Sequence, residues 1–224
     1  HVLVFVGPIL LSTDVFSYQA YARMAALYGA NPYLQGPHVI ALDPLYPFVG
    51  AKWVTTPSAY GPVFTLFSYV LAHLSIAASA LAYKALAALA SLATVALVWN
   101  CARLRGLNSA RAATLVGLNP LLVIYGVGGG HNDLLMLVLL VSGIYALLQQ
   151  RHRTTGAVTV IAAGVKLTAV LFLPFLIASG SGLGGRSRRR EIAIGASAAT
   201  VGVAILGFAA FGGGPLHLLG TLQR

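Results

Sequence analysis

Apolar runs separated by short polar breaks fill most of the chain. Beyond the first sixty residues the runs lie near 63–80, 82–102, 112–127, 133–149, 156–178 and 192–212. Several of them approach the ~20 residues that a helix needs to cross the hydrocarbon core of a bilayer. Heptads and fixed-period repeats are absent from the sequence. The pattern predicts an all-α protein, built as a multi-pass bundle of transmembrane helices.

Residues 13–60 interrupt this pattern. The segment 14–28 has helical character, begins at a candidate N-cap and stops at Gly29. We expect it to be an amphipathic helix that lies along the membrane interface. The remainder, through Tyr60, is rich in proline and aromatic residues and predicts an irregular loop. Irregular backbone is not tolerated against lipid, so 13–60 should lie outside the hydrocarbon or line a cavity.

The composition supports a membrane protein. Hydrophobic residues make up 58% of the chain and charged residues only 8%, against roughly 25% charged residues in soluble domains. The net charge of +10 arises from 14 Lys and Arg against four acids, and the basic residues fall mainly between apolar runs. That placement fits loops facing anionic lipid and argues against nucleic acid as a partner. A single cysteine, Cys101, forms no internal disulfide and offers no metal-ligand spacing.

Three basic clusters suggest a membrane orientation. They are Arg103/Arg105/Arg111, Arg151/Arg153 and Arg186/Arg188/Arg189/Arg190. The positive-inside rule places all three in the cytoplasm, which makes 112–149 a helical hairpin with an external tip at 128–133. The run 156–178 then joins two inside clusters although it is long enough for only one crossing. Either it is a re-entrant pair broken near Lys166, or one cluster is misassigned. Likewise, if residues 13–60 are external, only one of the two runs in 63–102 crosses the membrane fully.

The chain starts at His1 rather than at a methionine, and it ends soon after its last apolar run. Residues 1–12 look like the end of a spanning helix. We therefore interpret 1–224 as one transmembrane domain that is truncated at both ends.

Asp14 is the first candidate for chemistry. It follows the first apolar run, where the membrane surface is expected. The carboxylate has two possible roles, a helix N-cap or a general base at the mouth of a cavity, and its position in the sequence favours neither.

The stretch from Gly128 to Asp133 is the most polar point in a long apolar region. Asn132 or Asp133 could cap the following helix, and the glycines could simply form the turn. Glycines also let backbone approach a ligand closely, and a helix N-terminus beside His131 would favour an anion such as phosphate. We favour the functional interpretation.

Lys166 lies midway along an apolar run, where we favour a cavity-facing cation paired with an anionic group over a side chain that snorkels to the interface. Lys52 and Arg23 are expected to be solvated, and Lys84 to mark a helix end. The aromatic residues of the loop form either an interfacial belt or stacking platforms for a sugar. We favour the belt for most of them and leave both roles open for Trp53 and Tyr60. These aromatics are Tyr18, Tyr21, Tyr33, Trp53 and Tyr60.

Several motifs resemble those of a known family. Ser12-Thr13-Asp14-Val15-Phe16-Ser17-Tyr18, Gly29-Ala30-Asn31-Pro32-Tyr33 and Gly36-Pro37 resemble the first external loop of bacterial polyprenol-phosphate-mannose-dependent mannosyltransferases. Thr56-Pro57-Ser58-Ala59-Tyr60-Gly61-Pro62 is similar to that loop's exit, and Asn119-Pro120-Leu121-Leu122 with Gly129-Gly130-His131-Asn132-Asp133 to the family's internal hairpin. Val165-Lys166 is similar to a later lysine-containing helix. The matches run in order from about residue 12 to 175 and are most similar to the α-(1→6)-mannosyltransferases of actinobacterial cell envelopes.

The resemblance implies a GT-C fold in the bacterial plasma membrane, with a long first loop and an active site on the extracytoplasmic face. It implies transfer of a sugar, expected to be mannose, from a polyprenyl-phosphate donor to a cell-envelope glycan or glycolipid such as lipomannan, with inversion. No nucleotide, cofactor or metal ion is implied. The resemblance also implies that Asp14 acts as the general base. We expect Lys166, His131 and Lys52 to bind the donor phosphate. Asn132, Asp133, Tyr18, Tyr60 and Trp53 are the candidates for contact with substrate.

The sequence leaves two other functions open. The chain could belong to a transporter or lipid flippase with a polar path near Lys166 and His131, although transporters more often carry charges along several helices and have related halves. It could also belong to a non-catalytic protein that binds polyprenyl phosphate. The sequence has no P-loop, GxSxG, HExxH or CxxC motif.

Overall fold

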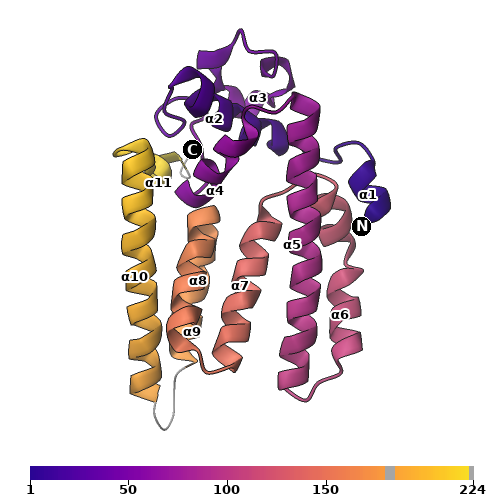
Figure 1. The fold of residues 1–224 in the computed structure, drawn as a ribbon, viewed down its shortest axis with the longest axis vertical. Coiled ribbons are helices and arrows are strands. Elements are labelled where there is room, and N and C mark those ends of the chain that lie inside the picture. Colours follow the sequence, from indigo (N-terminus) through magenta and orange to yellow (C-terminus); the bar gives the residue numbers. More distant parts are fainter. Residues whose placement is uncertain (180–184, 222–224) are drawn as a thin grey trace.

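The computed structural model describes residues 1–179 and 185–221, and these residues form helices and turns only. Helices α5 to α10 stand side by side and make up the helical body, while α2, α3 and α4 lie together over one end of it (Figure 1). The elements before the body are α1 (Val2–Val6), α2 (Asp14–Tyr28), η1 (Pro37–Ile40), η2 (Tyr46–Phe48), α3 (Ala51–Val54), α4 (Pro62–Ser68) and η3 (Tyr69–Leu71). The body and the elements after it are α5 (Ile76–Leu104), α6 (Ser109–Gly117), η4 (Leu121–Val127), α7 (Asp133–Leu148), α8 (His152–Val165), η5 (Leu167–Phe172), α9 (Leu173–Ala178), α10 (Gly185–Phe211), η6 (Gly214–His217) and α11 (Leu218–Thr221).

Two helices, α5 and α10, are long and apolar enough to cross a membrane. A third candidate span consists of α6 and η4, which are bent by 43° at the break between them. The outer face of α10 exposes large apolar side chains, among them Val201, Ile205 and Phe208. Water would disfavour such a face, whereas lipid accommodates it. These lengths and exposed faces are those of a membrane protein.

The run 156–178 turns back on itself. Helix α8 ends at Val165, and Lys166 is extended, with φ −145° and ψ 123°. Segments η5 and α9 then return along α8 toward the end where it began (Figure 1). Of the two possibilities left open by the sequence, the structure therefore has the pair broken at Lys166. Likewise, only α5 within 63–102 is a full-length helix.

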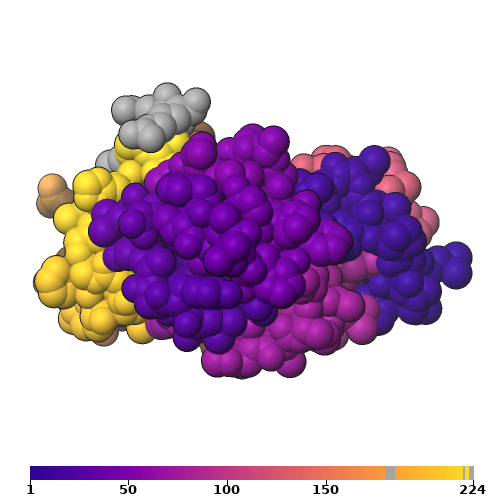
Figure 2. All heavy atoms as spheres, turned by 90° about the horizontal axis from the view of Figure 1, so that it is seen from above, coloured from indigo at the N-terminus to yellow at the C-terminus, as the bar shows by residue number. Residues whose placement is uncertain are grey.

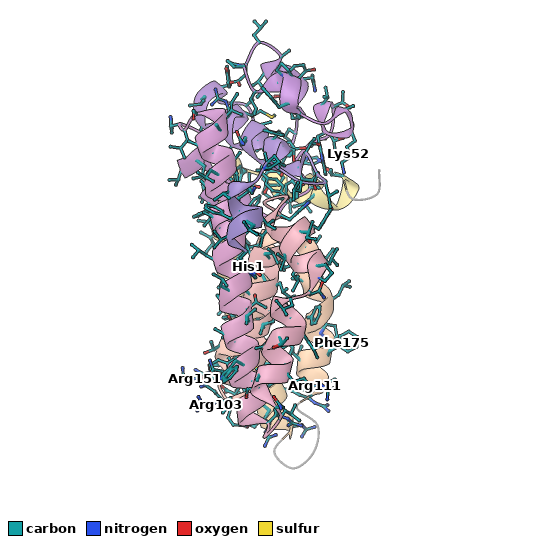
Figure 3. All side chains as sticks on the ribbon, turned by 90° about the vertical axis from the view of Figure 1, so that its right-hand side faces the viewer. His1, Lys52, Arg103, Arg111, Arg151 and Phe175 are labelled. Carbon is teal, nitrogen blue, oxygen red and sulfur yellow. The ribbon has the colours of Figure 1, made fainter. Side chains whose placement is uncertain are left out.

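The basic clusters gather at one end of the body. Arg103, Arg111 and Arg151 lie together at the end opposite Lys52 (Figure 3). Helix α10, which carries the third cluster in its first turns, also begins there (Figure 1). We call this the basic end, and the opposite end, with α2 and α3, the loop end. Charge is thus segregated along the helix axes, as the positive-inside rule requires of a multi-pass protein.

Small residues set the spacing of α8 and α10. A Cβ on Gly156 would collide with the carbonyl oxygen of Ile192, and one on Gly195 with that of Arg153. The two backbones therefore touch, as helices in lipid do when small residues line their interface. Arg153 and Glu191 form an ion pair across the same interface.

The loop region, residues 13–60, covers the loop end of the body and shares a hydrophobic core with it, since Phe64, Tyr83 and Val165 belong to the same cluster (Figure 2). Helix α2 has the expected bounds, but the predicted amphipathic character is wrong, because residues around its whole circumference are buried. The predicted interfacial belt is also wrong for Tyr18, Tyr21 and Tyr33, which are each 1% exposed. Tyr60, for which both roles were left open, is buried as well, at 4% exposed. Tyr18 packs edge-on against Tyr60 at a centroid distance of 4.9 Å. These rings form a packed aromatic core, in which edge-to-face pairs are favourable.

Two cations have roles that differ from those expected. Arg23 is not simply solvated but forms an ion pair with the fully buried carboxylate of Asp43, Nη2 to Oδ2, at 2.8 Å. Lys84 does not mark a helix end. It lies within α5, is 3% exposed, and donates to the carbonyl oxygens of Gly7 and Pro8 at 2.6 and 3.1 Å. Those bonds satisfy a charge that would otherwise be costly to bury.

Candidate active site

Four segments far apart in the sequence meet at the loop end. They are the start of α2, the short helix α3, the turn between η4 and α7, and the break between α8 and η5. Each brings at least one charged side chain: Asp14, Lys52, the His131–Asp133 pair of the turn, and Lys166. The sequence-predicted cations and carboxylates are therefore brought into one cluster.

Asp14 is the first residue of α2, but its carboxylate does not cap the helix. Its Oδ1 instead accepts a hydrogen bond from the indole Nε1 of Trp53 at 2.9 Å, and Lys52 Nζ lies 3.8 Å from the same oxygen. The helix N-terminus favours a negative charge at this position. The side chain is 18% exposed. Trp53 and Lys52 thus hold the Asp14 carboxylate in place, while one of its oxygens stays open to a further partner.

Gly50 allows α3 to approach Asp14. A Cβ at this position would lie 2.5 Å from Oγ1 of Thr13, the residue just before α2. Without that side chain, the chain can turn directly into α3 and place Lys52 and Trp53 beside the carboxylate. The Lys52 ammonium also lies 4.7 Å from the centre of the Trp53 ring, which is a cation–π distance.

The turn between η4 and α7 is shaped by its glycines. Gly130 has φ +63°, a conformation that side chains other than glycine rarely adopt. A Cβ on Gly129 would lie 2.6 Å from the ring of His131. The carbonyl of Gly128 accepts a hydrogen bond from the Leu10 amide at 3.1 Å, which ties the turn to the segment leading into α2. These contacts bring His131 to the level of Asp14.

His131 lies between two carboxylates. Its Nδ1 is 3.8 Å from Oδ2 of Asp14 and 4.0 Å from Oδ2 of Asp133. The side chain is 2% exposed and stacks on the ring of Tyr125 at 4.1 Å. Burial lowers the pKa of His131 below its usual range and outweighs the opposing effect of the two carboxylates. The imidazole is therefore neutral near pH 7.

Lys166 and Asp133 form the second charged pair of the site. The ammonium contacts both carboxylate oxygens, at 2.7 and 2.8 Å. The side chains are 30% and 43% exposed, so the pair faces solvent on one side. The loop exit packs beside it, since the Gly61 amide donates to the carbonyl of Val165 at 3.0 Å. The lysine is thus paired with an anionic group, as its sequence position suggested.

A cavity of about 530 Å³ opens at Asp14. Asp14 and Lys52 provide its charged groups, and the remaining walls combine apolar side chains with Ser12 and Thr13. The lining consists of Ile9, Leu11, Ser12, Thr13, Asp14, Phe16, Lys52 and Tyr125. A cavity that combines apolar walls with a few convergent polar groups is a common form of small-molecule site.

Other predicted substrate contacts lie beneath the cavity rather than at its surface. Tyr18, Tyr60 and Asn132 are 1%, 4% and 1% exposed, and the Tyr18 hydroxyl lies 3.4 Å from Oδ1 of Asn132. Trp53 is partly exposed and contacts Asp14 directly. Sequence reasoning missed Tyr125, which lines the cavity and supports His131. Tyr125 belongs to η4, whose wide turns place the Gly128 amide 3.2 Å from the Val123 carbonyl. Such π-type turns are frequent at functional sites, and this structural feature is what points to Tyr125.

The arrangement suits acid–base chemistry next to an anion. One carboxylate faces the cavity, a neutral imidazole lies behind it, and two ammonium groups flank them. Over residues 1–179 and 185–221, the acidic, histidine and cysteine side chains form no group of three suited to a metal ion.

Comparison with known proteins agrees with the motifs. Residues 3–180 match the family described as "Alpha-(1->6)-mannopyranosyltransferase, N-terminal domain". Alpha-(1->6)-mannopyranosyltransferase A of Mycobacterium tuberculosis is 35% identical over 185 residues, which are 78% of this chain and 35% of the relative. The protein of the same name from Corynebacterium glutamicum is 29% identical over 178 residues, covering 78% of this chain and 36% of the relative.

A third relative, alpha-(1->6)-mannopyranosyltransferase B of Corynebacterium glutamicum, is 28% identical over 217 residues, covering 85% of this chain and 36% of its own length. The chain thus spans about a third of the length of these relatives. No solved structure matches it significantly. Because the family match covers residues 3–180, most of the chain, the chain belongs to the alpha-(1->6)-mannopyranosyltransferase family.

Proposed function

We propose that the protein to which this chain belongs is a membrane mannosyltransferase that takes its sugar from a polyprenyl-phosphate donor and passes it to a cell-envelope glycan or glycolipid. The observation that supports this most strongly is the Asp14 carboxylate at a cavity that Lys52 also lines. A transferase of this kind needs a base for the acceptor hydroxyl and a cation for the departing phosphate. The cavity provides both.

In the proposed reaction, Asp14 removes the proton from an acceptor hydroxyl. The acceptor oxygen then bonds to C1 of the mannose, and the bond between C1 and the phosphate oxygen breaks, with its electron pair going to the phosphate. Trp53 holds Asp14 Oδ1, so Oδ2 is the oxygen available to the hydroxyl. Lys52 stabilises the charge that develops on the leaving group, and Lys166 supports it from the Asp133 side.

The proposed reaction inverts the configuration at C1 of the mannose, because a single displacement brings the acceptor oxygen to the face opposite the departing phosphate. The second carboxylate of the site, Asp133, is engaged by Lys166 in both its oxygens and is not offered as a nucleophile. The relatives are named for α-(1→6) products. A donor with a β-linked phosphate would therefore be required.

The side of the membrane is part of the proposal. The basic end would face the cytoplasm and the loop end the exterior of the bacterial plasma membrane. A site on the outer face has no access to cytoplasmic nucleotide sugars, so a donor carried by a membrane lipid is chemically consistent. The exposed apolar helices would keep that lipid close to the site.

The test is reconstitution of the full-length protein in liposomes with an α-(1→6)-oligomannoside acceptor. Radiolabelled mannose is supplied on polyprenyl phosphate in one arm and on a nucleoside diphosphate in the other. We expect transfer from the lipid donor alone, with a product sensitive to α-mannosidase. Transfer from the nucleotide donor alone would overturn the donor assignment. Movement of lipid or solute across the bilayer without transfer would instead indicate a transporter or flippase.

A further inference from the structure

The surroundings of His131 do not suit direct contact with a phosphate. Its side chain is 2% exposed, and Nε2 is buried without a hydrogen-bond partner among the described residues. Tyr125 stacks on one face of the ring and covers it. This burial favours a role for His131 other than the predicted one as a phosphate ligand.

The charged groups around the ring come from every element that packs against it. Asp14 on α2 and Asp133 on α7 face Nδ1 at 3.8 and 4.0 Å. Lys52 on α3 and Lys166 at the end of α8 are farther from the ring and act on it through their charge. Tyr125 on η4 covers a face and fixes the plane of the imidazole. Nδ1 thus points at the gap between the two carboxylates.

This placement joins a partly buried carboxylate to a more exposed one. Asp14 is 18% exposed and Asp133 is 43% exposed, with the imidazole between them. Both separations exceed hydrogen-bond length by less than 1 Å, and catalytic hydrogen bonds are often long before substrate binds. Small rotations of both carboxylates toward Nδ1 would complete a continuous path.

We propose that His131 is a positioning residue that takes up the proton Asp14 removes from the acceptor and passes it toward Asp133, which returns Asp14 to its basic form. This inference rests on the proposed transferase function. The proton balance is closed: it leaves the acceptor hydroxyl, moves from Asp14 to Nδ1, and reaches solvent through Asp133. No oxidant, metal or cofactor is needed.

The electrostatics fit both halves of the step. Burial lowers the pKa of His131, so the resting ring is neutral. In the tautomer that carries its proton on Nε2, the Nδ1 lone pair faces Asp14 and can accept the transferred proton. Once protonated, it lies between two negative charges, which stabilise the imidazolium. Lys166 offsets part of the charge of Asp133, and this favours onward release rather than a trapped ion pair.

The test compares the full-length wild type with His131→Asn in liposomes, using polyprenyl-phosphate mannose. Asparagine places a neutral polar group of similar size near the Nδ1 position but cannot take up a proton there. We expect kcat to fall about 10- to 100-fold while the KM for the donor stays within about twofold. The acid limb of the kcat profile should move to lower pH, because a carboxyl group titrates below an imidazole. His73→Asn, at an exposed position outside the site, is the matched control and should behave as wild type.

Asp133→Asn provides a second test if the histidine variant unfolds, and it should shift the kcat profile in the same direction. A raised donor KM with unchanged kcat and unchanged pH profile in His131→Asn would overturn the inference and restore direct phosphate binding. If Asp14→Asn is inactive while both relay variants match wild type, only the relay fails. If the wild type itself transfers no mannose, the proposed function fails instead.

Discussion

The loop region contains two carboxylates, Asp14 and Asp43, that are held in opposite ways. Asp43 is fully buried and accepts hydrogen bonds from Arg23, Tyr28 and the Leu45 amide. Asp14 accepts one direct hydrogen bond from a side chain, that of Trp53, and faces a cavity. Both oxygens of Asp43 are engaged in hydrogen bonds that stabilise the fold, whereas Oδ2 of Asp14 accepts no hydrogen bond from the described residues. Partner number and access, rather than charge, distinguish a structural acid from a candidate base.

The largest effect is expected from Asp14→Asn. Loss of the base should reduce mannosyl transfer by the full-length protein about 10³-fold, near the middle of the range for general base catalysis. The thermal unfolding midpoint, followed by tryptophan fluorescence, should barely change, because an asparagine oxygen can still accept the Trp53 hydrogen bond. A variant that retains transfer but unfolds early would reverse the comparison and make Asp14 the structural acid.

Asp43→Asn should show the opposite pattern. Removing one partner of a buried ion pair leaves Arg23 uncompensated, and such changes cost about 3 kcal/mol in the free energy of unfolding. The chain that remains folded should still transfer mannose at the wild-type rate. Unfolding in a denaturant series, with activity measured per folded protein, separates the two effects.

The pH dependence of stability sharpens this prediction. Burial raises the pKa of Asp43, but the bonds from Arg23, the Leu45 amide and Tyr28 outweigh it and lower the pKa below its usual value. A lowered pKa means that the contribution to stability is present above about pH 4 and is lost as the pH falls through the folded-state value. Wild type should therefore lose more stability than Asp43→Asn between about pH 5 and pH 2. Equal losses would show that Asp43 contributes nothing through its charge.

A smaller effect is expected at Lys52. Replacing it with methionine removes the ammonium from the cavity wall and should lower kcat/KM for the lipid donor about tenfold, or about 1.4 kcal/mol. Lys52→Arg preserves the charge and should recover most of the activity. If both variants match wild type, the leaving phosphate is stabilised elsewhere, with Lys166 the next candidate.

The smallest effect is expected at Leu11, whose φ of +62° is unfavourable for a residue with a side chain. Its side chain is 75% exposed, so little packing is lost on substitution. Leu11→Gly should raise the free energy of unfolding by up to about 1 kcal/mol, through relief of backbone strain. Leu10→Gly, one residue earlier and partly buried, should instead be destabilising. Equal destabilisation by both would indicate that the turn carries no strain.

Local signals explain what the sequence predicted well. The bounds of α2 followed from a polar start and from Gly29, which takes the left-handed C-cap with φ +64°. The turn ending at Asp133 and the break at Lys166 each placed polar residues inside an apolar region, which is a conspicuous pattern in a membrane protein. Both proved to be parts of one cluster.

Long-range contacts explain what the sequence did not predict. Helix α2 is buried because other segments cover it. Its tyrosine, alanine and methionine residues would suit a helix at the membrane interface equally well, so the sequence did not predict this burial. Lys84 is satisfied by carbonyls 76 and 77 positions away. The support that Tyr125 gives His131 depends on the wide turn of η4. None of these contacts leaves a periodic or motif-like trace in the chain.

The most direct test of the central claim is an experimental structure of the full-length protein with a polyprenyl-phosphate sugar and an oligomannoside acceptor bound. We expect an Asp14 carboxylate oxygen within hydrogen-bond reach of an acceptor hydroxyl, about 2.6–3.2 Å, with the donor phosphate beside Lys52. A donor headgroup bound at the basic end, among Arg186 and its neighbours, with the Asp14 cavity empty, would contradict it.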